Sequence, residues 1–342
     1  MVYIILVNWN GWKDTIECIE SLLRLTNQKF RIIVCDNNSQ DSSIEKILCW
    51  SRGEQQASLD GPPWIKIGAN SPRRREPTIE VINETERLLP NSSVVTIVGL
   101  NENRGFAGGC NVGMRLARSD PGAEFIWLLN NDTVVAPDSL SLVLARMRAD
   151  PSLGILGCCL LNYDEPDVVQ CLGVSYNFWT ARTAFIGVDL PSNKLPELAQ
   201  IEGKLAYVGG ASLIVPVRLL DDVGEMAEEF FLYFEELDWA MRIKGKYRQS
   251  VCLESRIYHK EGSSIGSSFA NRPSATSRYY LGINLLRFTA KHAPLHLPFA
   301  LLRLSIEFLR HIVKRDREAV IVKFMVFTDF FLNRRRRGLI RI

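Results

Sequence analysis

The pattern of apolar and polar positions repeats twice in the first fifty residues. An apolar run over residues 3–10 ends in polar side chains, and residues 14–25 follow with apolar side chains at helical spacing. An apolar run over 30–41 and a helical pattern over 42–50 repeat the arrangement. This strand–helix–strand–helix opening predicts an α/β fold with a doubly wound, mostly parallel sheet. In such sheets ligands bind at the carboxyl ends of the strands, where these polar residues lie.

The strand–helix pattern is interrupted at residues 51–93, which show little periodicity. We interpret these residues as an insertion that forms partly a loop or hairpin. After it the pattern predicts strands over 94–100 and 124–132, helices over 111–118 and 137–149, a β-prone stretch over 171–186, and strongly patterned segments over 207–216 and 230–243. After Ser277 the pattern is helical and basic to the end.

Composition adds little until the charge is divided along the chain. The 342 residues are 46% hydrophobic and 23% charged, which excludes disordered, collagen-like and coiled-coil proteins. None of the eight cysteines forms a CxxC pair, and most lie in apolar runs, so we expect buried, reduced thiols in a cytoplasmic protein. We find neither a signal peptide nor an apolar stretch long enough for a standard transmembrane helix.

The net charge of +3 hides a basic C-terminal region. From Arg287 onward the chain holds 13 Lys and Arg against 4 Asp and Glu, a net charge of +9, so the first 286 residues carry −6. Basic residues beside apolar helical stretches favour contact with anionic lipid. A solvated C-terminal end and a helix pair that forms a homodimer are the alternatives. We expect no nucleic-acid partner, because no aromatic residues accompany the Arg73–75 run.

Two polar clusters follow the first two predicted strands. Asn8 and Asn10 lie in the first, and Asp36 and Asn38 in the second. A carboxylate at a strand end can bind a nucleotide base or ribose hydroxyls. The cluster over residues 36–43 is also rich in helix-capping residues, so a helix N-cap is the alternative.

A glycine-rich segment, NENRGFAGGCNVG over residues 101–113, opens another predicted helix. Glycines let the backbone approach a ligand closely, and helix-start N–H groups attract phosphate. The spacing matches neither a Walker A loop nor GxGxxG. A tight turn explains the glycines equally well.

A metal site is the third hypothesis. Asn130, Asn131 and Asp132 end an apolar strand, and Mg²⁺ often needs only one or two carboxylates when phosphate oxygens complete its shell. His259 follows a later strand and would share the metal if it reaches Asp132. The alternatives are a capped turn for Asp132 and a structural role for the histidine.

A fourth candidate is a catalytic carboxylate. Glu235, Glu236 and Asp238 follow the aromatic run FFLYF and open a predicted helix. A carboxylate beside aromatic walls can have a raised pKa and act as a general base. Acidic residues are also common at helix N-termini because they interact favourably with the helix dipole.

The order of these clusters resembles the family 2 glycosyltransferases of the GT-A fold, and within them the rhamnosyltransferase-like branch. The matching segments are VNWNG at 7–11, DNNSQD at 36–41, NRGFAGGCNVG at 103–113, WLLNNDTVVAPDSL at 127–140, GGASLIVP at 209–216, FFLYFEELDWAMR at 230–242 and IYHKEGSSIG at 257–266. The resemblance spans residues 2–290. It implies a catalytic domain over 1–290, with 51–93 as the insertion, and a basic helical extension over 291–342.

The resemblance also implies site roles. Asp36 would contact the base, with Asn8, Asn10 and Asn38 beside it. The diphosphate region would be lined by Asn103, Arg104, Gly105, Gly108, Gly109 and Asn111. Asn130, Asn131 and Asp132 would take the place of the family's DXD metal motif, with Asn rather than Asp at its first position. Asp132 and His259 would hold Mg²⁺ or Mn²⁺, and Gly209, Gly210 and Ala211 would shape the acceptor face. Glu236 lies where the family usually has its catalytic Asp, so Glu235 and Asp238 stay alternative bases.

The function implied is an inverting transfer of a sugar, rhamnose being the branch's example, from a nucleotide-diphosphate sugar to a glycan or lipid-linked acceptor in polysaccharide and cell-envelope biosynthesis. Such an enzyme would be cytoplasmic or peripheral on the cytoplasmic face of the membrane. The departures at Asn130 and Glu236 leave a noncatalytic nucleotide-sugar-binding protein on the same scaffold as the alternative. A nucleotidyltransferase lacks support, because residues 7–15 carry no glycine-rich basic signature.

Overall fold

The computed structural model describes residues 1–56, 76–86, 89, 93–260 and 273–340. Ten strands form one central sheet in the order β3-β4-β2-β1-β5-β11-β7-β12-β6, with β8 beside β7. These strands are β1 (Val2–Asn8), β2 (Phe30–Asp36), β3 (Ile79–Asn83), β4 (Val95–Gly99), β5 (Phe125–Asn130), β6 (Thr133–Val135), β7 (Leu153–Asn162), β8 (Val169–Cys171), β11 (Ser212–Pro216) and β12 (Arg248–His259). A separate two-stranded hairpin joins β9 (Val174–Asn177) to β10 (Arg182–Phe185).

The first half of the sheet is parallel, as the sequence predicts. Strands β3, β4, β2, β1 and β5 all pair in parallel. The register places Asn8 opposite Asp36 and Val7 opposite Asn130. The polar residues that follow three separate apolar runs therefore meet at one edge, and the predicted mostly parallel fold class is confirmed.

The second half of the sheet is mixed. Strand β11 runs antiparallel to both β5 and β7, β12 pairs with β7 in parallel, and β6 pairs with β12 antiparallel. The last of these pairings sets His259 opposite Thr133. It thus brings the end of β12 to the residues that follow β5.

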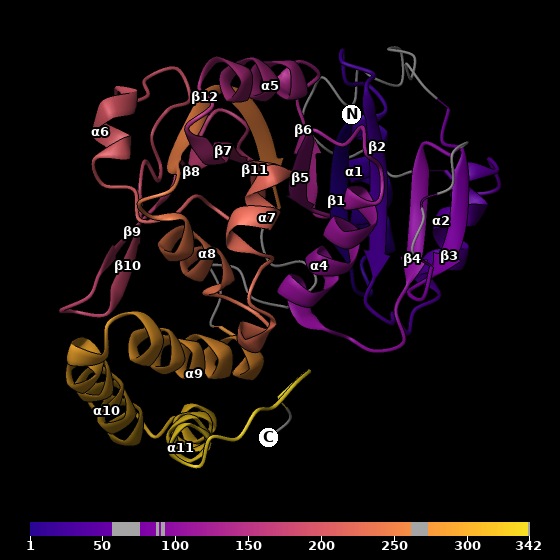
Figure 1. Ribbon diagram of the computed structural model, residues 1–342. Coiled ribbons are helices and arrows are strands. Elements are labelled where there is room, and N and C mark those ends of the chain that lie inside the picture. Colours follow the sequence, from indigo (N-terminus) through magenta and orange to yellow (C-terminus); the bar gives the residue numbers. More distant parts are fainter. Residues whose placement is uncertain (57–75, 87–88, 90–92, 261–272, 341–342) are drawn as a thin grey trace.

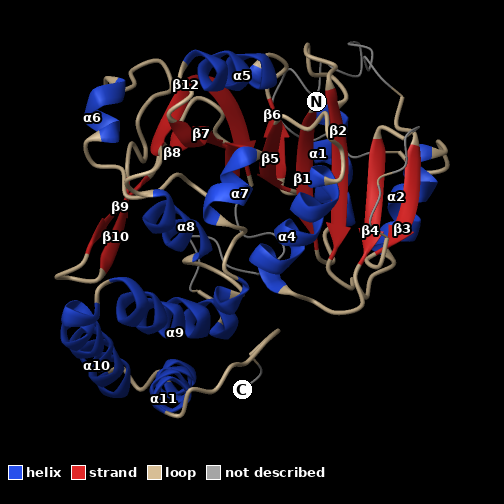
Figure 2. Cartoon of the chain, in the orientation of Figure 1, coloured by secondary structure: helices blue, strands red, loops and turns tan. Residues whose placement is uncertain are grey.

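Helices cover both faces of the sheet, because its strands are apolar on both sides (Figures 1 and 2). One face packs against α1 (Trp12–Leu22), α2 (Ser43–Ser51) and α5 (Ser139–Ala149). The other packs against α4 (Gly105–Arg118), α6 (Leu198–Glu202), α7 (Arg218–Val223) and α8 (Glu235–Ile243). In β1, Ile4 and Leu6 face the first group, whereas Tyr3 and Ile5 face the second.

Helix α4 begins six residues earlier than the pattern predicts, because its glycines serve packing. A Cβ atom at Gly109 would lie 2.8 Å from Cγ1 of Val7, and one at Gly113 would lie 2.6 Å from Cγ2 of Ile5. The helix therefore rests directly on strand β1. Helical periodicity of apolar side chains is weak at the start of this helix, because glycines form part of the face that contacts the sheet.

The predicted insertion contributes to the sheet. Residues 51–93 contain β3, which pairs in parallel with β4 and so forms an edge strand rather than a hairpin. The Arg73–75 run lies outside the described residues. All eight cysteines lie within them as free thiols, and seven are buried.

Three helices close the chain: α9 (Ala275–His292), α10 (Leu297–Val313) and α11 (Arg317–Phe331). They share an apolar core with Phe231, and α9 also buries Phe288 against Phe230 and Leu237. The boundary predicted at residue 290 falls inside α9, which packs against both parts. In Figure 1 the three helices lie below the sheet, at the lower edge of the view. No helix in the described part of the chain is long and apolar enough to span a membrane.

Candidate active site

A continuous hydrogen-bond chain joins the ends of β5, β1 and β2. Nδ2 of Asn131 donates to Oγ1 of Thr15 at 2.9 Å, the Thr15 hydroxyl donates to Oδ1 of Asn8 at 2.8 Å, and Nδ2 of Asn8 donates to Oδ2 of Asp36 at 2.6 Å. All four side chains are buried. Asp36 also accepts hydrogen bonds from the N–H and hydroxyl of Ser39. The chain therefore fixes three predicted site residues relative to one another.

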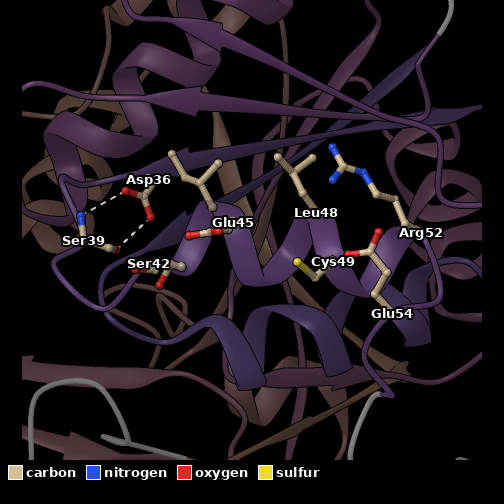
Figure 3. A pocket seen from close by; sticks show the side chains of 10 residues that line it. Asp36, Ser39, Ser42, Glu45, Leu48, Cys49, Arg52 and Glu54 are labelled. Carbon is tan, nitrogen blue, oxygen red and sulfur yellow. Dashed lines mark hydrogen bonds between the residues drawn. The ribbon is translucent and has the colours of Figure 1, made fainter.

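A cavity of about 640 Å³ opens beside Asp36 and follows α2. Figure 3 shows Asp36 and Ser39 at one end of the cavity and Arg52 and Glu54 at the other. Between them the lining side chains come from α2 and include the apolar Ile44 and Leu48. An elongated cavity with a carboxylate at its end has the size and polarity of a small-molecule pocket.

Asn10 and Asn38 lie at the exposed rim of this region. Both adopt positive φ values, 53° and 58°, which asparagine tolerates better than most residues. Oδ1 of Asn10 accepts from the N–H of Gln40, and Nδ2 of Asn38 donates to the carbonyl of Asn101. Asn37, which the sequence did not single out, is buried and donates to the carbonyl of Gly105 at 2.9 Å. These asparagines hold the strand-end loops in place.

Asp132 and His259 lie together, as the metal hypothesis requires. Oδ1 of Asp132 is 3.2 Å from Nε2 of His259, and Nδ2 of Asn130 is 3.4 Å from the same ring nitrogen. Burial alone would raise the pKa of the Asp132 carboxyl, but the neighbouring His259 outweighs burial and the pKa is lowered. Asp132 is therefore held as a carboxylate.

Gln170 orients the histidine. Its Oε1 is 2.7 Å from Nδ1 of His259, and its Nε2 donates to the His259 carbonyl at 3.2 Å. With Nδ1–H donated to the amide oxygen of Gln170, the other ring nitrogen, Nε2, faces Asp132 and is the atom that would bind a cation there. A partner that fixes the ring and its tautomer in this way is typical of histidine ligands.

The residues present fit a divalent cation. The described residues contain no group of three or more His, Cys, Asp or Glu side chains that could hold a metal. A carboxylate and an imidazole nitrogen nevertheless supply two ligands, and Mg²⁺ commonly takes its remaining ligands from phosphate oxygens and water. The pair therefore suits a cation that binds together with a phosphorylated ligand.

The structure gives several residues of the glycine-rich segment structural partners. Oδ1 of Asn103 accepts from the N–H of Gly105, and Arg104 forms a 2.8 Å ion pair with Glu84. Asn111 is buried, exchanges hydrogen bonds with the backbone of Met226, and also donates to Glu228. Because the side-chain amide of Asn111 is already hydrogen-bonded to Met226 and Glu228, we withdraw Asn111 as a residue that lines the diphosphate region.

The other two glycines predicted for this region also meet protein atoms. A Cβ at Gly105, whose φ is +72°, would lie 2.1 Å from the carbonyl oxygen of Phe231. A Cβ at Gly108 would lie 2.5 Å from Cβ of Arg104. With Gly109 resting on Val7, close packing accounts for all three glycines.

Glu236 lies over the end of β11. A Cβ at Gly210 would lie 1.7 Å from Oε1 of Glu236, so only glycine leaves room for this carboxylate. The carbonyl of Ala211, the next residue, accepts from the backbone N–H of Asn130 at 2.9 Å. Glu236 therefore lies at the same edge of the sheet as the Asn130–Asp132 turn.

Glu235 and Glu236 are adjacent buried carboxyls. Burial and the nearby Glu236 charge hold the pKa of Glu235 well above its ordinary range, and burial raises the pKa of Glu236 to about 7. Glu235 is 2% exposed, while Glu236 is less buried and faces Gly210. Glu236 is thus the better placed of the two to exchange a proton with a bound molecule.

Asp238 has a different role from the one the sequence allowed. Its carboxylate is fully buried and contacts Lys291 at 2.8 Å, His292 at 2.7 Å and Arg242 at 2.7 Å. Although burial opposes ionisation, hydrogen bonds from these three residues lower its pKa. Two of them belong to α9, so Asp238 ties α8 to α9, and we withdraw it as a candidate base.

The turn before α8 is held in an unusual backbone conformation. Phe231, Tyr233 and Phe234 have φ values of 57°, 67° and 76°, which bulky residues rarely adopt. Nδ2 of Asn284 on α9 lies 2.5, 2.8 and 3.1 Å from the carbonyls of residues 230, 232 and 233. Asn284 thus satisfies three carbonyls of this turn, and the N–H of Phe106 on α4 donates to a fourth, the carbonyl of Phe231.

We expect an Asn284→Leu variant to be less stable by about 1–3 kcal/mol, because the substitution leaves buried carbonyls without a donor. Urea unfolding measures the change. The control is Gln200→Leu, since Gln200 is exposed on α6 and the substitution should stay within about 0.5 kcal/mol. Equal midpoints for Asn284→Leu and wild type would contradict the role of this contact.

Gln170 and Asn284 were missed by sequence reasoning. Neither residue lies in a polar cluster at a strand end, and each acts through a partner far away in the chain, His259 and the turn after Phe230. Asn284 has one detectable signal, a polar side chain among the apolar residues of α9. Gln170 has none, because it lies on the three-residue strand β8.

Comparisons with known proteins identify the family and the fold. A family model described as "Glycosyltransferase like family 2" matches residues 66–273, and one described as "Glycosyl transferase family 2" matches residues 3–60. No curated protein matches the sequence. The first match covers more than half of the chain, and together the two include every strand of the central sheet.

Two solved structures share the fold. The mannosyltransferase PcManGT from Pyrobaculum calidifontis, in complex with GDP-Man and Mn²⁺, matches with 13% identity and a TM-score of 0.53 over 97% of this chain and 87% of that one. GalNAc-T7 with UDP, GalNAc and Mn²⁺ matches with 12% identity and a TM-score of 0.55, over 89% of this chain and 54% of that one. At these identities the likeness to solved structures shows only the GT-A fold. The family matches show membership: the chain belongs to the family 2 glycosyltransferases.

Proposed function

We propose that this glycosyltransferase transfers a sugar, with rhamnose as the first candidate, from a nucleotide-diphosphate sugar to a hydroxyl of a glycan or lipid-linked acceptor, with inversion at the anomeric carbon. One observation carries the proposal: a half-buried carboxyl with a raised pKa, Glu236, lies at the sheet edge that also holds Asp132 and His259. A base and a site for a phosphate-bound cation are the two parts that this reaction needs.

On the donor side, the cavity beside Asp36 would take the nucleoside. Asn8 and Ser39 hold the Asp36 carboxylate in place, so this carboxylate offers a rigid acceptor for hydrogen bonds from the base or the ribose. Asp132 and His259 would hold Mg²⁺ or Mn²⁺ against the diphosphate, with Asn130 beside them. When bound, the cation supplies positive charge that neutralises the leaving diphosphate. The Mn²⁺ complexes of PcManGT and GalNAc-T7 support a divalent ion.

On the acceptor side, Glu236 would remove the proton from the attacking hydroxyl. The hydroxyl oxygen forms a bond to C1 of the sugar from the face opposite the diphosphate, and the bond from C1 to the diphosphate oxygen breaks. Glu236 keeps the proton, and the nucleoside diphosphate leaves with the electron pair. A single displacement of this kind inverts the anomeric carbon and needs no enzyme nucleophile.

Donor turnover tests the function. The purified chain should hydrolyse or transfer at least one sugar from a panel of nucleotide-sugars with Mg²⁺ or Mn²⁺. The panel includes dTDP-rhamnose, UDP-GlcNAc and GDP-Man. Tight binding without turnover of any donor would instead favour the noncatalytic nucleotide-sugar-binding protein.

The geometry around Gln170 leads to a separate prediction. A Gln170→Leu variant should bind Mn²⁺ about 10–100-fold more weakly, because His259 loses the partner that fixes its ring. Electron paramagnetic resonance of Mn²⁺ in the presence of UDP or GDP measures this directly. Gln200→Leu on α6 is again the control. Unchanged Mn²⁺ affinity in Gln170→Leu would contradict a positioning role.

We also propose the division into a catalytic unit, residues 1–290, and a C-terminal extension, residues 291–342, with α9 packing against both. In this proposal the enzyme works at the cytoplasmic face of a membrane, where a lipid-linked acceptor would lie. The basic residues of the extension support that location.

A further inference from the structure

Helix α10 exposes a regular apolar stripe. Six residues spaced alternately four and three apart form the stripe: Leu295, Phe299, Leu302, Ile306, Leu309 and Val313. Leu295 lies in the short 3₁₀ helix just before α10, and this spacing places the other five on one side of α10. Their side chains are 41% to 87% exposed, whereas Ala300 and Leu304 on the other side are buried in the core shared with α9 and α11. The helix is therefore apolar on its packed side and on its free side.

The apolar surface extends from the stripe onto the neighbouring β9–β10 hairpin. Trp179, 65% exposed at the turn of the β9–β10 hairpin, contacts Phe299 with ring centroids 5.2 Å apart. The same hairpin is fixed to α10 by a hydrogen bond from Arg303 to the carbonyl of Ala181. On α11, Ile321 and Phe324 are also exposed. Large contiguous apolar patches on a folded protein mark sites of interaction.

Basic side chains surround the end of this surface. Arg310, Lys314, Arg315 and Arg317 are exposed where α10 passes into α11, and none of them forms an ion pair with any described residue. Residues 334–337 add four consecutive arginines after α11, and three of these have carboxylate neighbours. The positive charge at the helix junction is thus left for a partner outside the chain.

We infer that the α10 stripe, together with Trp179 and the basic residues at the α10–α11 junction, docks on an anionic lipid bilayer. Helices of this type lie in the plane of the membrane, with the apolar face about 5–10 Å deep at the headgroup boundary and the basic residues at the anionic lipid headgroups. Tryptophan is enriched at that depth. The inference deepens the peripheral membrane contact of the proposed function and rests on it.

Charge favours a bilayer over a second copy of the chain. The described residues from 293 to 340 hold ten Lys and Arg against four Asp and Glu. A symmetric contact between this surface and the same surface of a second copy would bring the same excess of positive charge to both sides of the interface. An anionic bilayer offers both the apolar interior that the stripe needs and the negative charge that the junction needs.

Flotation of the full chain with lipid vesicles tests whether this surface binds a membrane. Wild type should float with vesicles of mixed phosphatidylcholine and phosphatidylglycerol, and less with phosphatidylcholine alone. A Leu302→Glu, Leu309→Glu double variant should bind at least about ten-fold more weakly, because two charges would have to enter the apolar layer. The matched control is Val81→Glu with Val188→Glu, two valines that are each 45% exposed outside the surface.

The possible outcomes distinguish membrane docking from loss of folding, loss of catalysis and dimer formation. Thermal unfolding shows that each variant is folded, and Glu236→Gln should float like wild type, so failure of the chemistry does not mimic failure of docking. A Lys314→Gln, Arg315→Gln variant should lose its preference for phosphatidylglycerol. Equal flotation of wild type and Leu302→Glu, Leu309→Glu would overturn the inference. The inference would also be overturned if wild type fails to float, forms a dimer in solution, and the Leu302→Glu, Leu309→Glu variant is monomeric. The surface would then be a contact between two copies of the chain.

Discussion

A Glu236→Gln variant is expected to lose activity by about 10²–10⁴-fold, the usual contribution of a positioned general base. The amide keeps the size of the side chain and its place over Gly210, but it cannot accept the acceptor's proton. Turnover with the best donor and acceptor measures the loss. The control is Glu229→Gln, because Glu229 lies seven residues before Glu236 and its carboxylate pairs with Lys291 and Arg335.

The pH dependence of the wild-type enzyme follows from the same carboxyl. Glu236 acts as a base only when deprotonated, and burial raises its pKa to about 7. The rate should therefore fall as pH drops through about 7. Because the pKa is higher in the folded protein than in the unfolded chain, ionisation of Glu236 costs stability above pH 7, and Glu236→Gln should be at least as stable as wild type there. A stable variant with full activity would refute Glu236 as the base.

An Asp132→Asn variant is expected to bind Mn²⁺ and to turn over its donor at least about 100-fold less well. This loss should exceed that of Gln170→Leu, because Gln170 only orients the ligand His259. Asparagine preserves the shape of the side chain beside His259 but removes its charge. Electron paramagnetic resonance of Mn²⁺ with UDP or GDP, read beside the turnover assay, separates lost metal binding from lost catalysis.

Asp138→Asn provides the matched control for this experiment. Asp138 lies six residues downstream, is exposed, and makes no side-chain capping bond to α5. Wild-type Mn²⁺ affinity in Asp132→Asn would exclude Asp132 as the metal ligand.

The meeting of the polar residues at the ends of β1, β2 and β5 is the part of the site's geometry that the sequence predicts best. Asn8, Asp36 and Asn131 each follow an apolar run, and parallel pairing necessarily brings the ends of such runs together. The structure adds the contacts between them, through Thr15 on α1. Periodicity also predicts α1, α2 and α5 to within about three residues at each end, because these helices bury an amphipathic face.

Residue type alone could not separate function from packing elsewhere. Asp238 has the same side chain and the same helix-start position that a base would have, yet its partners lie on α9. Gly105 and Gly109 have the glycine character of a phosphate loop, yet what lies over them is Phe231 and Val7. Which atoms come to face a given residue depends on tertiary contacts with distant segments, and one sequence does not contain that information in readable form.

The glycines of α4 have a consequence for how this enzyme can change. Gly109 rests on Val7 of β1, and one turn earlier Gly105 rests on Phe231, in the turn that leads to Glu236. The helix thus fixes the distance between the strand edge proposed to bind the donor and the proposed base, Glu236. A larger side chain at either glycine would shift both halves of the site together. New specificity for donor or acceptor is therefore more accessible through the surrounding loops than through this helix.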